Sequence, residues 1–107
     1  MKDDEHKPPI HLVPVGPLYE IARVMQYGTE KYSAHNWRKD KDSTPHSRTY
    51  SSIMRHLMAY WDGQDIDPES NLSHLSHAAS QLFMLIEYIH TVPEMDDRYK
   101  ESKDESS

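Results

Sequence analysis

Apolar residues recur every three or four positions in three stretches of this chain, which is the spacing of one face of an α-helix. The stretches run from about residue 17 to 32, from about 47 to 62 and from about 71 to 90. No stretch alternates in the manner of a strand. The pattern predicts an all-α fold, a small antiparallel bundle of three main helices. The stripe positions are Leu18, Ile21, Ala22 and Met25, then Tyr50, Ile53, Met54, Leu57 and Trp61, then Leu72, Leu75, Ala79, Leu82, Phe83, Ile86 and Ile89.

Residues that start or stop helices stand at the ends of these stretches. Pro17 suits the first turn of the first helix, and Ser47 is the expected N-cap of the second. Gly63 follows the second helix as a stop, and Pro93 closes the third. These signals fix the predicted boundaries to within a few residues.

The two ends of the chain differ in composition from the helical stretches. Residues 1–9 are charged and contain two prolines, which is typical of a flexible arm. Residues 94–107 are rich in Asp, Glu, Lys and Ser and lack apolar periodicity, so a disordered acidic tail is expected there. The predicted helical domain covers residues 10–93.

Composition narrows the classes of function. A chain of 107 residues buries a limited core, and three amphipathic helices leave apolar surface, so we expect a homo-oligomer. A net charge of −6 argues against a duplex nucleic-acid partner. The absence of cysteine excludes thiolate metal sites. No apolar run approaches a membrane span and no signal peptide is evident, so we expect a cytoplasmic protein without a membrane partner.

The stretch from Arg55 to Gln81 concentrates the chemistry of the chain. Two of its three histidines, His74 and His77, are one helical turn apart and lie on one face with Gln81. Two imidazoles on one helix face can hold a metal, and the acids of the preceding turn can complete the shell. The candidate metal ligands are Asp67, Glu69, His74 and His77. The candidate catalytic residues are His56, Asp65 and Glu69, and His56 could serve either as a general base or as a further ligand.

Each part of this segment also has a structural interpretation. The histidines can form hydrogen bonds at a helix interface, and the acidic turn can serve as a helix cap. Arg55 can form an ion pair with Asp62, Asp65 or Glu69 instead of holding a phosphate. Four acids within eight residues nevertheless repel one another, which costs free energy unless a cation offsets their charge.

A second group of residues suits a nucleotide ligand. Lys31 and Arg38 can neutralise phosphates, and Trp37 can stack on a base, although an aromatic residue can equally anchor its loop by burial. The candidate substrate-binding residues are Lys31, Asn36, Trp37, Arg38, Arg55 and Gln81.

The order of short motifs along the chain resembles one known family. The motifs are Leu12-Val-Pro14, Ala22-Arg-Val24, Tyr27-Gly28, Lys31-Tyr32, Asn36-Trp37, Arg55-His56-Leu57, the segment Gly63–Ser70 and His74-x-x-His77-Ala78. Together they resemble the phage dATP/dGTP diphosphohydrolase N-terminal domain family, which is similar in role to the MazG-like nucleotide pyrophosphohydrolases. The resemblance covers about residues 10–89. The paired ExxE and ExxD motifs of MazG are missing, and Gln81 stands where the resemblance leads us to expect Asn.

The resemblance implies an all-helical enzyme of phage nucleotide pools. It implies hydrolysis of a purine deoxynucleoside triphosphate to the monophosphate and diphosphate with a divalent metal, which would be Mg, Mn or Co. The runner-up is a phage protein that binds a nucleotide without cleaving it, as a sponge for a signalling nucleotide of host defence would. Calorimetry with a nucleotide panel, with and without chelator, separates these two hypotheses. A third possibility is a purely structural oligomeric phage protein, which would bind no nucleotide.

Overall fold

The computed structural model describes residues 6–31 and 44–101 and contains three main helices. They are α1 (Val15–Lys31), α3 (His46–Trp61) and α4 (His74–Thr91). Each begins and ends within three residues of its predicted range, so the all-α prediction is confirmed. The shorter elements are two 3₁₀ turns, η2 (Ile10–Leu12) and η4 (Pro93–Met95), and two strands, β1 (Ile66–Asp67) and β2 (Leu72–Ser73).

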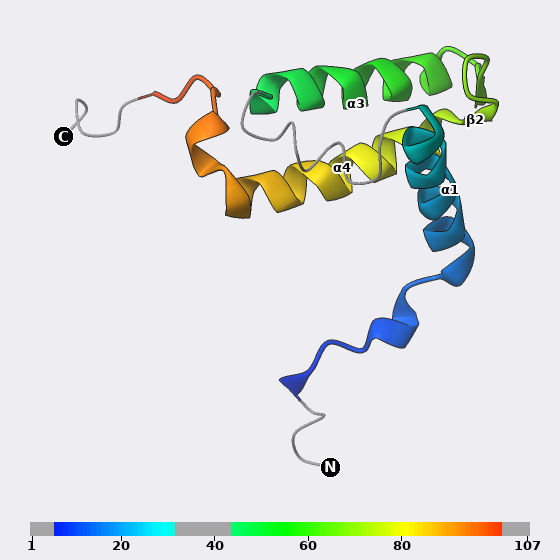
Figure 1. Ribbon diagram of the computed structural model, residues 1–107, viewed down its shortest axis with the longest axis horizontal. Helices are drawn as coiled ribbons and strands as arrows, with labels where there is room; N and C mark the ends of the chain where they lie inside the picture. The colour runs from blue at the N-terminus through cyan, green and yellow to red at the C-terminus, as the bar shows by residue number, and fades with distance from the viewer. Residues whose placement is uncertain (1–5, 32–43, 102–107) are drawn as a thin grey trace.

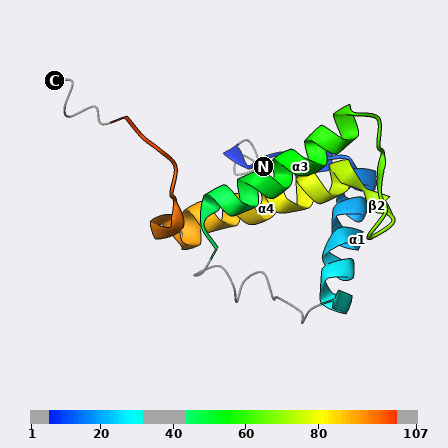
Figure 2. The ribbon, with the colours of Figure 1, turned by 90° about the horizontal axis from the view of Figure 1, so that it is seen from above.

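Helices α3 and α4 lie side by side and run antiparallel, while α1 lies across the N-terminal half of α4 (Figures 1 and 2). Side-chain hydrogen bonds from Ser76 and Ser80 join α4 to α1 within the described part of the chain. The Ser76 hydroxyl donates to Glu20 Oε1 at 2.8 Å, and the Ser80 hydroxyl donates to Met25 Sδ at 3.5 Å. The transverse position of α1 therefore depends partly on small polar side chains of α4.

Helix α3 ends at the predicted glycine. Gly63 has φ +99°, a conformation that favours glycine, and its N–H donates to the Tyr60 carbonyl. The next N–H, that of Gln64, donates to the Ala59 carbonyl at 3.0 Å. This pair of bonds is the Schellman pattern that ends many helices. It turns the chain sharply, so that α4 can fold back along α3.

A small hairpin that the sequence pattern did not predict fills the turn between α3 and α4. Ile66 pairs with Ser73 and Asp67 pairs with Leu72 in antiparallel register. Strands of two residues are too short to show alternation, which is why the pattern missed them. Because the hairpin takes up the acidic segment, α4 is capped by Ser73, whose hydroxyl accepts from the N–H groups of the next turn.

The start of α3 also differs from the prediction. The N-cap is Pro45, which has no capping side chain, and Ser47 lies inside the first turn. The N–H of Ser47 donates to Asp97 Oδ1 at 2.9 Å, and the Ser47 hydroxyl also bonds this carboxylate. Prediction of Ser47 as the cap was wrong because the group that satisfies the helix terminus comes from 50 residues further along the chain.

Polar side chains make up about half of the buried residues in the described part of the chain. The buried hydrophobic residues among those described are Val24, Ile53, Ala78, Tyr88 and Val92. The buried polar residues are His46, Thr49, His74, Ser76, His77 and Ser80. Most residues of the predicted apolar stripes on α3 and α4 remain exposed. The histidines His74 and His77, which carry the candidate chemistry, are therefore among the buried residues.

Several predicted features fall on residues outside those described. They are the segments 1–5 and 102–107 of the predicted arm and tail, and the loop containing Asn36, Trp37 and Arg38. The side chain of Lys31 is also outside the described part. Among the helices of segments 6–31 and 44–101, none has the length and apolarity needed to cross a membrane.

Candidate metal centre

Three elements bring the chemical groups of the Arg55–Gln81 segment together. His56 comes from the second half of α3, Asp67 from β1, and His74 and His77 from the first turn of α4. The hairpin folds α4 back on α3, so the first turn of α4 faces the second half of α3. The one-turn spacing of His74 and His77 then points both imidazoles toward the same side.

His56, Asp67 and His77 form the cluster that could hold a cation. One ligand atom from each of these side chains lies within 4.8 Å of the other two. Asp67 Oδ2 lies 3.8 Å from His77 Nε2. The rings of His56 and His77 are stacked, with centroids 4.7 Å apart and planes 7° apart.

The spacing and the donor types of this cluster fit a divalent metal. Ligand atoms around a tetrahedral ion with bonds of about 2.0–2.1 Å lie roughly 3.3 Å apart, so small side-chain shifts would close the site. Two imidazoles and one carboxylate suit zinc, cobalt or manganese. This three-residue set leaves coordination positions for water or a substrate oxygen.

Both cluster histidines are held in the form that binds metals. Burial is the main cause that lowers the pKa of His56, and the neighbouring His77 and His74 lower it further. Burial also lowers the pKa of His77, while the charge of Asp67 opposes that effect. A neutral imidazole has a lone pair for a cation, whereas a protonated one repels it. At neutral pH the cluster therefore presents two neutral donors and one anionic donor.

His74 lies beside the cluster, not within it. Its Nδ1 is 2.9 Å from His56 Nδ1, and its Nε2 is 2.6 Å from Gln64 Oε1. The side chain is buried, with 6% of its surface exposed. Both ring nitrogens of His74 are thus engaged by protein groups.

The two predicted acids that are not in the cluster have other contacts. Asp65 is exposed, and its backbone carbonyl accepts from the His74 N–H at 3.0 Å. Glu69 is also exposed, and its backbone N–H donates to Asp67 Oδ1 at 2.9 Å. Its charge contributes to raising the pKa of His77, against the larger effect of burial. Glu69 therefore borders the cluster without supplying one of its three ligand atoms.

Two predicted substrate-binding residues lie within the described part near the cluster. Arg55 is exposed on α3, its charge acts on His56, and no ion pair joins it to Asp62 or Asp65. Gln81 donates from Nε2 to the Ser52 hydroxyl at 2.8 Å, whereas its buried Oε1 has no hydrogen-bond partner. Arg55 is therefore open to an approaching ligand, whereas the unpaired Oε1 of Gln81 is buried.

The sequence of this chain is similar to that of a known protein family. A family model described as "dATP/dGTP diphosphohydrolase, N-terminal" matches residues 1–98. The chain belongs to this family. It is 33% identical over 98 residues to a dATP/dGTP diphosphohydrolase of Salmonella phage PMBT28, an alignment that covers 92% of this chain and 32% of that protein. The chain thus spans about a third of the length of this curated relative. No solved structure matches.

The resemblance stated from the sequence motifs is confirmed by this membership. In this member of the dATP/dGTP diphosphohydrolase N-terminal family, three residues near the cluster escaped the sequence analysis. The Ser70 hydroxyl is 2.6 Å from His77 Nε2, Gln64 contacts His74, and the Tyr27 ring meets the His77 ring edge-on at 6.3 Å. Ser70 and Gln64 lie inside the chemically rich segment, so their position was a usable signal. Tyr27 is on another helix, and only the fold brings it near.

Proposed function

We propose that this domain binds a divalent metal at His56, Asp67 and His77 and hydrolyses purine deoxynucleoside triphosphates to monophosphate and diphosphate. The observation that supports the proposal most strongly is the convergence of two neutral imidazoles and a carboxylate within 4.8 Å in a member of this family. The Salmonella phage relative is named for dATP and dGTP, and that name supplies the substrate class. The missing MazG acid pairs are compatible with a histidine-based site.

The metal and the residues around the cluster would have different roles in this hydrolysis. A bound metal would lower the pKa of a water molecule and neutralise phosphate oxygens. Arg55 is exposed beside His56 and would stabilise charge on the phosphates. Glu69, which is exposed and whose charge acts on His77, would take a proton from the attacking water.

The direct test incubates the purified chain with each dNTP and with Mg²⁺, Mn²⁺ or Co²⁺, and separates the products by ion-exchange chromatography. The proposal expects dAMP or dGMP together with diphosphate, and loss of turnover after chelation. If no metal supports turnover, the catalytic proposal fails. Tight nucleotide binding that chelator does not affect, with the ligand recovered intact, would instead support the sponge.

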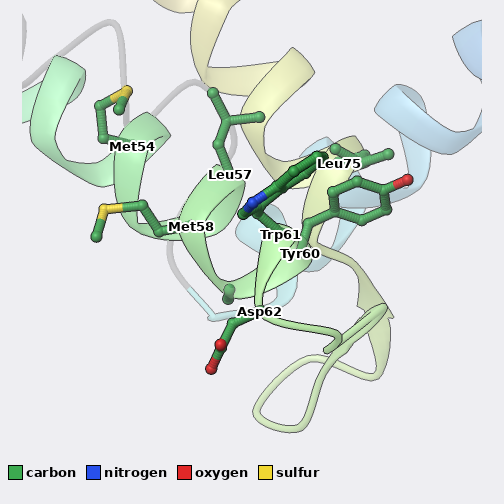
Figure 3. Close-up of a pocket in the computed structure, with 8 residues that line it drawn as sticks. Met54, Leu57, Met58, Tyr60, Trp61, Asp62 and Leu75 are labelled. Carbon is green, nitrogen blue, oxygen red and sulfur yellow. The ribbon is translucent and has the colours of Figure 1, made fainter.

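We also propose that a second copy of this chain covers an apolar face of α3 and α4. Leu75, Leu82, Ile86 and Ile89 recur on one side of α4, and a groove of about 780 Å³ joins Leu75 to the end of α3. Figure 3 shows that groove, with the Trp61 ring on its surface. Trp61 is 87% exposed, which is costly for the largest apolar side chain unless a partner covers it.

The exposed area of this face matches that of a stable interface. Large apolar side chains have about 150–250 Å² of surface each, so eight that are roughly half exposed present on the order of 800 Å². One partner in a standard interface buries about the same area. Two antiparallel helices with adjacent apolar stripes are half of a four-helix bundle, which a symmetric copy completes. The eight residues are Tyr50, Leu57, Met58, Trp61, Leu75, Leu82, Ile86 and Ile89.

Light scattering coupled to size exclusion tests this partner. The wild-type chain is expected to elute as a dimer or a larger even-numbered assembly, and Trp61→Glu is expected to shift it toward monomer. Tyr99→Glu is the matched control, since Tyr99 is 92% exposed in the C-terminal segment and lies outside this face. A monomeric wild type at micromolar concentration would overturn the proposed self-association.

A further inference from the structure

A chain of hydrogen bonds leads from the surface to the candidate metal centre. Gln64, exposed just after α3, contacts His74 Nε2 through Oε1 at 2.6 Å. His74 Nδ1 in turn lies 2.9 Å from His56 Nδ1. The His56 and His74 rings are tilted by 46° with centroids 5.1 Å apart, so they meet through these nitrogens and are not stacked.

The donor and acceptor roles along this chain follow from its outer end. An amide oxygen only accepts, so His74 Nε2 must carry the proton of that bond. A neutral imidazole has one N–H, which leaves His74 Nδ1 as an acceptor. His56 Nδ1 must then be the donor of the second bond. The Nε2 of neutral His56 is consequently left with a bare lone pair.

We propose that Gln64 and His74 are positioning residues that hold His56 as the Nδ1–H tautomer and make its Nε2 the metal-binding atom. This inference rests on the metal centre of the proposed function. Metal-binding histidines commonly donate their second N–H to an outer group, which fixes the ring and the tautomer. In this chain the outer group is a second histidine, whose own tautomer is set by an amide.

The reverse order of donors would abolish the site. If His56 Nδ1 accepted instead, neutral His56 would carry its proton on Nε2 and could not hold a cation with that atom. Gln64 therefore decides, across one intervening ring, whether His56 can join Asp67 and His77. This role also explains why His74 is buried with both nitrogens engaged although it contributes no ligand atom to the cluster.

Long-range ¹H–¹⁵N NMR of the imidazoles in the metal-free full chain tests the tautomers directly. At about pH 7.5 the inference expects the Nδ1–H form for His56 and the Nε2–H form for His74. This readout needs neither metal nor turnover. Observation of His56 as the Nε2–H tautomer would overturn the inference.

Substitution of Gln64 tests whether the order of hydrogen-bond donors from His56 through His74 to Gln64 affects metal binding. Gln64→Met keeps the side-chain length but removes the acceptor, and the exposed position should leave the fold intact. The expected results are a mixture of His74 tautomers and a loss of Co²⁺ affinity of about 10–100-fold in calorimetry, the range seen for outer-shell groups. Gln26→Met, at an exposed position on α1, is the matched control and should bind Co²⁺ as the wild type does.

The outcomes separate this inference from the proposed function. If wild type binds Co²⁺ and Gln64→Met binds it equally well with unchanged tautomers, the positioning role is refuted while the metal centre stands. If wild type binds no metal, the metal-binding role given to the His56 lone pair fails together with the metal centre, even if the NMR tautomers are as expected. If the expected tautomers and the affinity loss both occur in a chain without turnover, the positioning role holds and only the hydrolase proposal fails.

Discussion

Asp67→Asn separates the charge of the candidate metal centre from its architecture. Asp67 is the only charged member of the three-residue cluster. Its Oδ1 accepts from the Glu69 N–H at 2.9 Å, and the amide oxygen of Asn can accept the same bond. The hairpin that carries the residue should therefore keep its shape. What the substitution removes is the anionic oxygen that lies 3.8 Å from His77 Nε2.

The expected loss of metal affinity can be bounded from below. Loss of an outer-shell partner typically costs 10–100-fold in affinity, and a direct anionic ligand should cost more. We therefore expect Co²⁺ to bind Asp67→Asn at least about 100-fold more weakly, which is about 2.7 kcal/mol. Calorimetry with Co²⁺ at about pH 7.5 measures this difference. The visible absorption of bound Co²⁺ gives a second reading of the same site.

A separate readout in the metal-free protein supports or refutes the same reasoning. The charge of Asp67 raises the pKa of both His56 and His77, against the larger effect of burial. In Asp67→Asn the pKa of both imidazoles should consequently fall further, as followed by NMR titration. Asp62→Asn, an exposed acid outside the cluster, is the control and should change neither reading. Wild-type Co²⁺ affinity in Asp67→Asn would refute the assignment of Asp67 as a ligand.

Three further predictions concern stability. The pKa of His56 and of His77 lies below its ordinary value, so the unfolded chain takes up protons first as the pH falls. The free energy of unfolding should therefore be full above about pH 6.5 and decrease as the pH falls toward the folded-state pKa values. Urea unfolding of the metal-free protein from about pH 7.5 to about pH 5.5 measures this change, and a rise in the free energy of unfolding on acidification would contradict it. Ile53→Ala should destabilise the chain by about 2–4 kcal/mol, because Ile53 is only 3% exposed in a very small apolar core, and an unchanged denaturation midpoint would show that this core is not limiting. Gly63→Ala should cost about 1 kcal/mol or more, since φ +99° strains any residue with a Cβ although open space surrounds the position, and thermal melting against Gly16→Ala, which lies in a helix, tests it.

Helix existence and type were predictable because they depend on local spacing. The three stretches became α1, α3 and α4, and Gly63 ends α3 as expected, since a positive φ favours one residue type. Features that depend on distant groups were not predictable. Asp97 caps α3 from 50 residues away, and the two-residue strands owe their existence to the fold of the turn.

Burial was the property that the sequence pattern described least well. The apolar stripes led us to expect a hydrophobic helix interface. In the structure, His46, Thr49 and His77 are buried, while Trp61 is 87% exposed. Periodicity indicates which residues share a helix face, but the face that meets another helix is decided by packing, and by any second copy of the chain.

For the candidate site, the sequence by itself determined the residue types and their crowding between positions 55 and 81. Tertiary structure alone decided that His56, Asp67 and His77 form the cluster, and that His74 stands behind His56 with Glu69 at the edge. The physical reason is that coordination and hydrogen bonding act over about 2–3 Å, whereas sequence spacing fixes positions only along one helix. The hairpin sets the relation between the two helices, and it is this relation that turns a run of acids and histidines into a site.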